Sequence, residues 1–178
     1  MRYRQVLACT MPTTAYLFLD FDGTLHGQRR DTVEFERAAL LDRWLAHHPH
    51  VRIVLSTAWR FSLDLDDLIR CLPPTIAARC IDTLPRDDRD FTPAGRGVLM
   101  REWMARHATP AASFAALDDA PDLFAADDPL VACDPSLGLT PANLEALARR
   151  LADPGRDLKP HAMAPSGHHP DSTEGRRT

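Results

Sequence analysis

The sequence predicts an α/β protein in which a central parallel sheet is covered by helices on both faces. Short apolar runs, typical of buried strands, alternate along the chain with stretches of helical periodicity. Three of these apolar runs are followed directly by acids or hydroxyls. Ligands of open α/β sheets bind at the carboxyl ends of the strands, so this coincidence predicts a functional site at one edge of the sheet.

The first predicted strand is the apolar run at residues 16–19, which is followed by Asp20, Asp22 and Gly23. Carboxylates beside a buried run cost free energy unless a cation or hydrogen-bond donors compensate them. An Asp-Gly turn after an ordinary strand is the simpler interpretation. The acids at the ends of later strands favour the interpretation as a site.

The other elements follow from periodicity and from residues that begin or end helices. A helix is predicted from a cap at Asp31 or Thr32, with Val33 facing inward, to about residue 48, before Pro49. Further helices are predicted after a cap at Ser62, over residues 95–107, and from residues 140–141 onward. Strands are predicted at residues 51–56, 113–117 and 130–133, with a short one at 78–82. The charged loop at 84–93 is interpreted as a solvated surface loop.

Length and composition are those of one ordinary globular domain. The chain has 178 residues, of which 44% are hydrophobic and 26% charged, and its net charge is −4. That charge excludes a global basic field for nucleic acid, and no apolar run is long enough to span a bilayer. Four scattered cysteines without C-x-x-C spacing argue against a zinc or dithiol site and favour reduced thiols in the cytoplasm.

We predict three segments from these patterns. Residues 1–13 form an N-terminal extension, and the true start is Met1 or Met11. Residues 14–152 form the folded domain. Residues 153–178 are rich in Pro, Gly, His and charge and lack apolar periodicity, so we expect a disordered tail.

Residues 16–24 read YLFLDFDGT, and this hhhhDxDGT pattern resembles the first motif of the haloacid-dehalogenase-like (HAD) phosphohydrolases. Three later stretches stand in the right order for the remaining motifs, so the resemblance covers roughly residues 15–150. The STAWR stretch at 56–60 and the short chain resemble a small subgroup, the HAD domains of Swiss Army Knife RNA repair proteins. The resemblance implies a three-layer α/β/α Rossmann-like fold with a minimal cap domain or none.

The resemblance also implies a magnesium-dependent phosphohydrolase that forms an aspartyl-phosphate on Asp20. Asp22 would act as general acid and then as general base, and an acid at this position favours a phosphatase or phosphomutase. Magnesium takes hard oxygen ligands. By resemblance these are a carboxylate oxygen of Asp20, the backbone carbonyl of Asp22, and an acid of the Asp118–Asp119 pair, with Asp119 preferred.

Polar residues after the second strand and before a later helix are the candidates for phosphate binding. Ser56 or Thr57 is expected to donate a hydrogen bond to a phosphoryl oxygen, and Ser56 is preferred because it directly follows the apolar run. Arg60 either binds phosphate or pairs with a loop acid. Arg96, at the start of a helix, fits the family's third-motif cation best, with Arg101 as the second choice.

A second hypothesis is a catalytically retired domain of the same fold that binds a phosphorylated ligand or a protein partner. The intact pair of acids in the first motif argues against it.

Little chain separates the motifs, so we expect an open site that suits bulky phosphorylated substrates such as a nucleotide, a nucleic-acid end or a phosphoprotein. No membrane partner is expected. The sequence indicates neither a particular substrate nor an oligomeric state.

Overall fold

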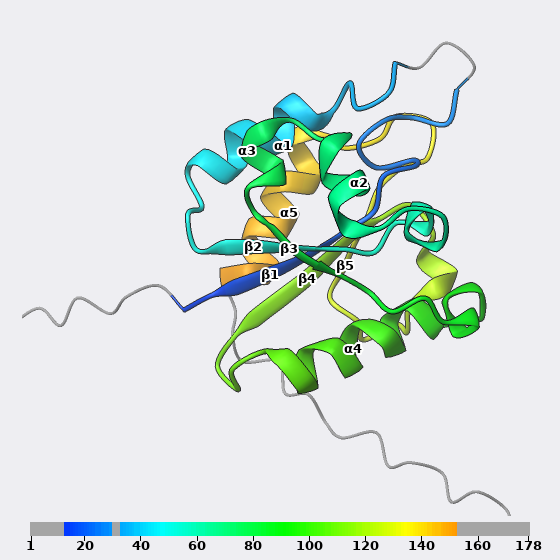
Figure 1. Cartoon of the computed structure of the whole chain (residues 1–178). Helices are drawn as coiled ribbons and strands as arrows, with labels where there is room; N and C mark the ends of the chain where they lie inside the picture. Colours follow the sequence, from blue (N-terminus) through cyan, green and yellow to red (C-terminus); the bar gives the residue numbers. More distant parts are fainter. Residues whose placement is uncertain (1–12, 30–32, 153–178) are drawn as a thin grey trace, which may run out of the picture.

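A five-stranded parallel sheet forms the centre of the protein (Figure 1). The computed structural model describes residues 13–29 and 33–152. The strands lie in the order β3-β2-β1-β4-β5, and every neighbouring pair is parallel. Their bounds are Ala15–Leu19 (β1), Val51–Leu55 (β2), Cys80–Thr83 (β3), Ser113–Asp118 (β4) and Leu130–Ala132 (β5). The predicted α/β class is therefore confirmed, and the first strand is the central one.

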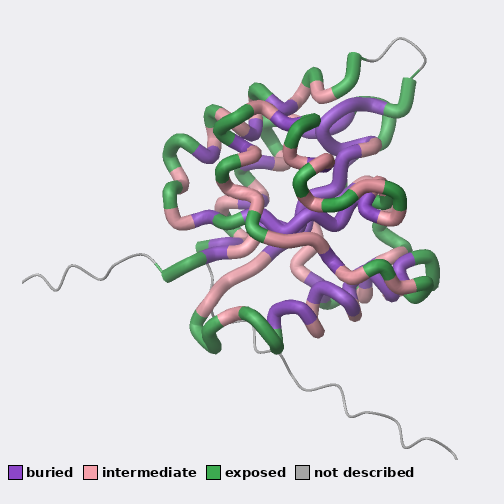
Figure 2. The backbone as a smooth tube through the Cα atoms, viewed as in Figure 1, coloured by how far each residue is buried: buried purple, intermediate pink, exposed green. Residues whose placement is uncertain are grey.

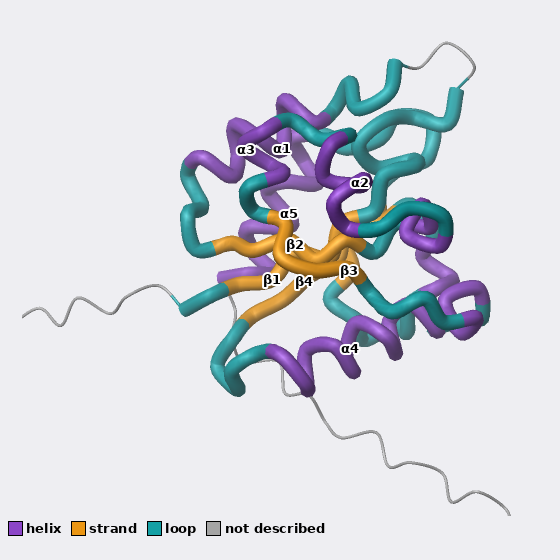
Figure 3. The backbone as a smooth tube through the Cα atoms, in the orientation of Figure 1, coloured by secondary structure: helices purple, strands orange, loops and turns teal. Residues whose placement is uncertain are grey.

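Helices cover both faces of this sheet, as Figures 1 and 3 show. One face carries α1 (Ala38–Ala46), α2 (Leu65–Arg70), α3 (Pro74–Ala77) and α5 (Pro141–Ala152). The other face carries α4 (Gly95–His107). Three short 3-10 helices lie in the loops: η1 (Ala58–Phe61), η2 (Asp88–Phe91) and η3 (Pro121–Leu123). This is the expected three-layer arrangement, and no separate cap domain interrupts it in the described part of the chain.

Two hydrophobic clusters, one on each face, pack the helices against the sheet. Leu17 and Leu19 of β1 belong to the larger cluster, whereas Phe18 between them belongs to the cluster under α4. Successive side chains of a strand point to opposite faces, so a strand covered on both sides must be apolar throughout. Figure 2 shows the strands at the centre as largely buried. None of the helices in residues 13–29 and 33–152 is long and apolar enough to cross a membrane.

The register of the sheet brings three strand ends to one level. Leu19 pairs with Leu55 on one side and with Leu117 on the other. Beyond these pairs, the backbone N–H of Asp20 donates to Leu117 O at 3.1 Å, and the N–H of Ser56 donates to Leu19 O at 2.9 Å. The residues that follow β1, β2 and β4 therefore leave the sheet side by side.

The first helix begins later than its sequence pattern predicts. The predicted caps, Asp31 and Thr32, lie outside the described residues, and Val33 is exposed rather than buried. The backbone of Phe35 has a φ of 57°, in the left-handed region. A right-handed helix cannot pass through that conformation, so α1 starts only at Ala38.

Two other boundaries of helices differ from the prediction. The side chain of Asp64, not Ser62, caps α2, accepting the N–H of Asp67 at 2.9 Å. A further helical turn, α3, begins at Pro74, where no helix is predicted, because proline is tolerated at the first position of a helix. The predicted segments 1–13 and 153–178 fall outside the described residues, apart from residue 13.

The interpretation of residues 84–93 as a solvated loop is wrong at Asp90, which is fully buried. Arg96 Nε and Nη2 donate to the two carboxylate oxygens of Asp90, each at 3.1 Å. Arg60 Nη2 lies 2.7 Å from Asp90 Oδ1, close enough for an ion pair but without hydrogen-bond alignment. Arg60 Nη1 also donates to the carbonyl oxygens of Ser56 and Thr57, at 2.5 and 2.8 Å. These contacts tie the loop after β2 to η2 and to the start of α4.

We predict that Asp90→Asn lowers the free energy of unfolding by about 3–5 kcal/mol, because breaking a buried ion pair leaves guanidinium charge uncompensated. Asp88→Asn, in the same 3-10 helix but exposed, is the matched control and should stay within about 0.5 kcal/mol of wild type. Urea unfolding followed by circular dichroism measures both. Equal stability of the two variants would contradict a structural role for Asp90.

Candidate functional site

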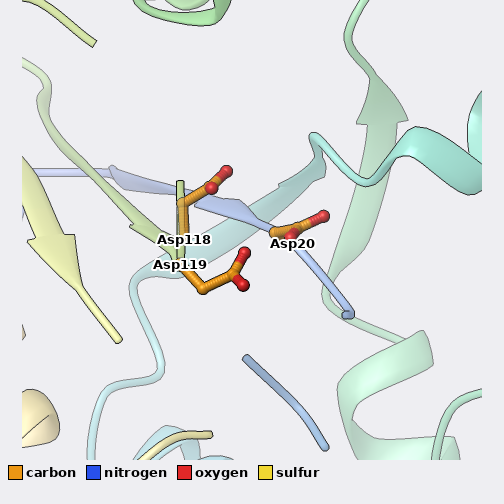
Figure 4. Close-up of side chains that lie close together, drawn as sticks. All are labelled: Asp20, Asp118 and Asp119. Carbon is orange, nitrogen blue, oxygen red and sulfur yellow. The ribbon is translucent and has the colours of Figure 1, made fainter. Parts of the chain in front are cut away.

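Three carboxylates meet at the carboxyl ends of two neighbouring strands (Figure 4). Asp20 follows β1, Asp118 ends β4, and Asp119 comes next in the chain. One carboxylate oxygen of each lies within 4.8 Å of the others. Asp20 and Asp118 are buried and Asp119 is half-buried. Because β1 and β4 end side by side, acids about 100 positions apart in the chain form one cluster.

Burial and mutual repulsion make this cluster electrostatically costly. Burial raises the pKa of Asp20 well above its ordinary value, and the neighbouring Asp118 raises it further, while Arg96 opposes the shift. The pKa of Asp118 is also raised by burial, against the effect of Arg96. Burial and then Asp118 raise the pKa of Asp119. The cluster thus favours either protonation or the presence of a cation.

Arg96 is the basic residue at the cluster. Its Nη1 donates to Asp118 Oδ2 at 2.6 Å and lies 3.8 Å from Asp20 Oδ1. Burial opposes its charge, but the carboxylates of Asp118, Asp90 and Asp20 hold its pKa above the ordinary value. Arg101, the second choice for this role, pairs instead with Asp128.

Asp118 and Asp119 differ in the hydrogen bonds that their carboxylate oxygens already accept. Asp118 Oδ2 accepts from Arg96, and its Oδ1 accepts the backbone N–H of Ala120 at 3.0 Å. Asp119 Oδ2 accepts from Gln28 Nε2 at 3.0 Å. Asp118 is buried, whereas Asp119 is half-buried. Asp119 therefore has the more accessible carboxylate, and the preference for it as a ligand stays a prediction.

Gly23 gives Asp119 the space to reach the first motif. Its φ is +64°, a conformation that favours glycine, and a Cβ atom there would lie 2.0 Å from Asp119 Oδ2. The glycine of the Asp-Gly pair is thus needed both for the turn and for the position of the acid across the site.

The charges around the cluster leave room for a divalent cation. Among the described residues, the ion pairs found for Asp20, Asp90 and Asp118 are with two guanidinium groups, those of Arg60 and Arg96, and Asp119 adds a fourth carboxylate. Two formal negative charges stay uncompensated. The carboxylate oxygens are hard ligands of the kind that Mg²⁺ binds, so the residues present fit such an ion.

The two hydroxyls after β2 have different surroundings. Ser56 Oγ is buried and has no hydrogen-bond partner among the described residues. Thr57 Oγ1 accepts the backbone N–H of Trp59 at 3.3 Å and so caps η1. A buried hydroxyl without a partner is costly, and its place beside the acid cluster suits it to an incoming ligand oxygen.

Arg60 takes the second of its two predicted roles. It pairs with the loop acid Asp90 and donates to backbone carbonyls of Ser56, Thr57 and Pro85. With its guanidinium so engaged, Arg60 supports the loop that presents Ser56.

Asp22 lies outside the acid cluster, and the partners of its carboxylate are an imidazole and an indole. His26 Nε2 is 3.1 Å from Asp22 Oδ1, and Trp59 Nε1 donates to Asp22 Oδ2 at 2.7 Å. The Asp22 side chain is 46% exposed, far more than Asp20. The two acids of the first motif therefore occupy unlike environments.

Sequence reasoning missed several residues of this site: Gln28, His26, Trp59 and Asp90. Asp90 stands in a run of alternating acidic and basic residues, which gives no signal that one member is buried. Trp59 lies in the STAWR stretch, close after the candidate hydroxyls Ser56 and Thr57, and this position is a signal that could have identified it.

Comparison with protein families gives a match over residues 16–144 to the family described as the HAD domain in Swiss Army Knife RNA repair proteins. The matched range includes both acids of the first motif, Ser56, Arg96 and the Asp118–Asp119 pair. Comparisons with curated proteins and with solved structures give no match. The match covers well over half of the chain and agrees with the fold and the site geometry, so the protein belongs to this family of HAD domains.

Proposed function

We propose that the protein is a magnesium-dependent phosphohydrolase that acts on phosphate monoesters through an aspartyl-phosphate on Asp20. The observation that carries this proposal is the cluster of Asp20, Asp118 and Asp119 at the level ends of β1 and β4, beside the buried Arg96. Membership in a HAD family supports hydrolase chemistry in general terms.

Asp20, Asp119 and the backbone carbonyl of Asp22 would hold the metal ion. When bound, Mg²⁺ supplies positive charge that keeps Asp20 ionised and reduces its repulsion with the phosphate dianion. Asp118 contributes less directly, since both of its oxygens already accept hydrogen bonds from Arg96 and Ala120.

The residues then divide the reaction into two displacements. In the first, a carboxylate oxygen of Asp20 forms a bond to phosphorus while the bond from phosphorus to the ester oxygen breaks, and Asp22 gives a proton to that oxygen. In the second, Asp22 takes a proton from a water molecule, whose oxygen attacks phosphorus and releases Asp20 and inorganic phosphate.

Arg96 and Ser56 would stabilise charge on the transferring group. Arg96 sits between Asp20 and Asp118, where its guanidinium balances the nucleophile's charge. Ser56 Oγ, which lacks a partner among the described residues, would donate to a phosphoryl oxygen. Such a donor is positioned before the reaction by β2 and needs little reorganisation.

The family description names RNA repair proteins, and the described chain carries no separate cap domain over the site. We therefore propose phosphorylated nucleic-acid ends and nucleotides as the first substrates to test. A panel of 3′- and 5′-phosphorylated oligonucleotides, nucleotides and sugar phosphates, assayed for phosphate release, ranks these classes.

Asp20→Asn should abolish phosphate release from p-nitrophenyl phosphate, because an amide is a poor nucleophile. The variant should fold normally, since removal of one buried charge relieves the cluster. Asp127→Asn, on an exposed loop, is the control and should retain wild-type rates. Release by Asp20→Asn at the wild-type rate would contradict the nucleophile assignment. A folded wild type that releases phosphate from no ester, with or without magnesium, would favour the retired, ligand-binding alternative.

The two acids after β4 should differ in a magnesium titration. Asp119→Asn should raise the magnesium concentration for half-maximal activity by at least the ~10–100-fold typical of weaker, indirect partners, because it removes a direct ligand. Asp118→Asn should raise it less and should lower thermal stability more, since Arg96 loses its closest carboxylate. Calorimetry with magnesium alone checks the affinity independently of turnover. The reverse order would exchange the roles of the two acids, and no change in either variant would place the metal elsewhere.

Ser56→Ala should lower kcat/KM by about 10- to 100-fold, as expected for one hydrogen bond to a charged group worth about 1.5–3 kcal/mol. Thr57→Ala should have a smaller effect, because the Thr57 hydroxyl accepts a backbone N–H in the loop. Steady-state kinetics and melting temperatures of both variants make the comparison. A larger loss in Thr57→Ala at equal stability would assign phosphate binding to Thr57.

A further inference from the structure

Both oxygens of the Asp22 carboxylate are bound by side-chain donors. Trp59 Nε1 donates to Oδ2 at 2.7 Å, and His26 Nε2 lies 3.1 Å from Oδ1. The Asp22 side chain is 46% exposed, so nearly half of its surface faces solvent and does not fix its orientation. These two donors, on separate segments of the chain, therefore decide where the carboxylate points.

His26 is itself oriented by the backbone. The N–H of Phe35 is directed at His26 Nδ1, at 3.4 Å. Because Nδ1 accepts that hydrogen bond, the proton of the neutral ring is assigned to Nε2, the atom that faces Asp22. Phe35 adopts its left-handed backbone conformation at this point, and strain of this kind in a non-glycine residue often accompanies a functional constraint.

The position of the Trp59 ring is also fixed by its neighbours. It belongs to η1, directly after the two hydroxyls that follow β2, and its backbone N–H donates to Thr57 Oγ1. Its ring makes edge-on contacts with Phe21, at 5.6 Å between centroids, and with Phe35, at 5.9 Å. The loop that presents the phosphate-binding hydroxyl thus also presents the indole N–H to Asp22.

We propose that Trp59 is a positioning residue, assisted by His26, that holds the Asp22 carboxylate in line with the leaving group for proton transfer. This inference rests on the proposed phosphohydrolase function. A general acid must lie within hydrogen-bond reach of the atom that it protonates, and a displacement of about 1 Å can cost ~100-fold in rate. An indole N–H suits this task because it binds the carboxylate without donating its own proton to the reaction.

Trp59→Phe keeps an aromatic ring in the Phe21–Phe35 cluster and removes the indole N–H together with part of the ring volume. We expect kcat for an alkyl phosphate to fall by about 10- to 100-fold, within the range of general acid catalysis, with KM little changed. For p-nitrophenyl phosphate, whose leaving group needs little protonation, we expect a loss of less than about 3-fold. Asp22→Asn should show the same selectivity and sets the upper limit of the effect.

Trp103→Phe is the matched control. Trp103 Nε1 donates to Asp82 Oδ2 at 2.6 Å, so this variant loses the same kind of bond. Trp103 lies on α4, packed against Tyr16 and Phe18, away from the acid cluster. Both esters should be hydrolysed by Trp103→Phe at wild-type rates.

The double variant Asp22→Asn/Trp59→Phe separates positioning from general structural support. If Trp59 acts only through Asp22, adding Trp59→Phe to Asp22→Asn should cause no further loss for the alkyl ester. A further loss in that background, or an equal loss for both esters in the single variant, would overturn the proposal while leaving the phosphohydrolase function intact. A wild type that hydrolyses neither ester would overturn the function itself, and the role of Trp59 with it.

Discussion

The carboxylate of Asp90, buried between Arg60 and Arg96, is the interaction on which the functional edge of the sheet depends. Arg60 binds backbone carbonyls after β2, and Arg96 lies in the first turn of α4, so this one acid joins the loop after β2 to the start of α4. Buried charges persist only when they are paired. The network therefore holds the loop after β2 and the start of α4 in one arrangement, and this arrangement sets the geometry of the site.

Arg96 belongs both to this buried network, which stabilises the fold, and to the acid cluster of the candidate site. Its guanidinium binds Asp90 on one side and Asp118 on the other, and lies near Asp20. A single charge thus supports the fold and lowers repulsion within the acid cluster. The negative charge that is left uncompensated is the physical reason to expect a divalent cation.

The two acids of the first motif show how one short loop can support two kinds of chemistry. Asp20 is buried among charges, and its pKa is raised by burial and by Asp118. Asp22 is half-exposed and bound by N–H groups of the His26 and Trp59 rings. Carboxylates placed in such different environments can take different roles, one as nucleophile and one in proton transfer.

The sequence by itself determined the parallel sheet and the strand ends at which the candidate residues leave it. Strands covered on both faces must be apolar throughout, and the acids and hydroxyls that follow them stand out against that pattern. Only the tertiary structure decided that Asp90 is buried and that Arg60 binds this acid. It also decided that Ser56 rather than Thr57 has the unpartnered hydroxyl, and that α1 begins only at Ala38. The reason is physical: local patterns record which residues a strand or helix must bury, whereas the partner of a charge or hydroxyl depends on which distant loops the packed sheet brings beside it.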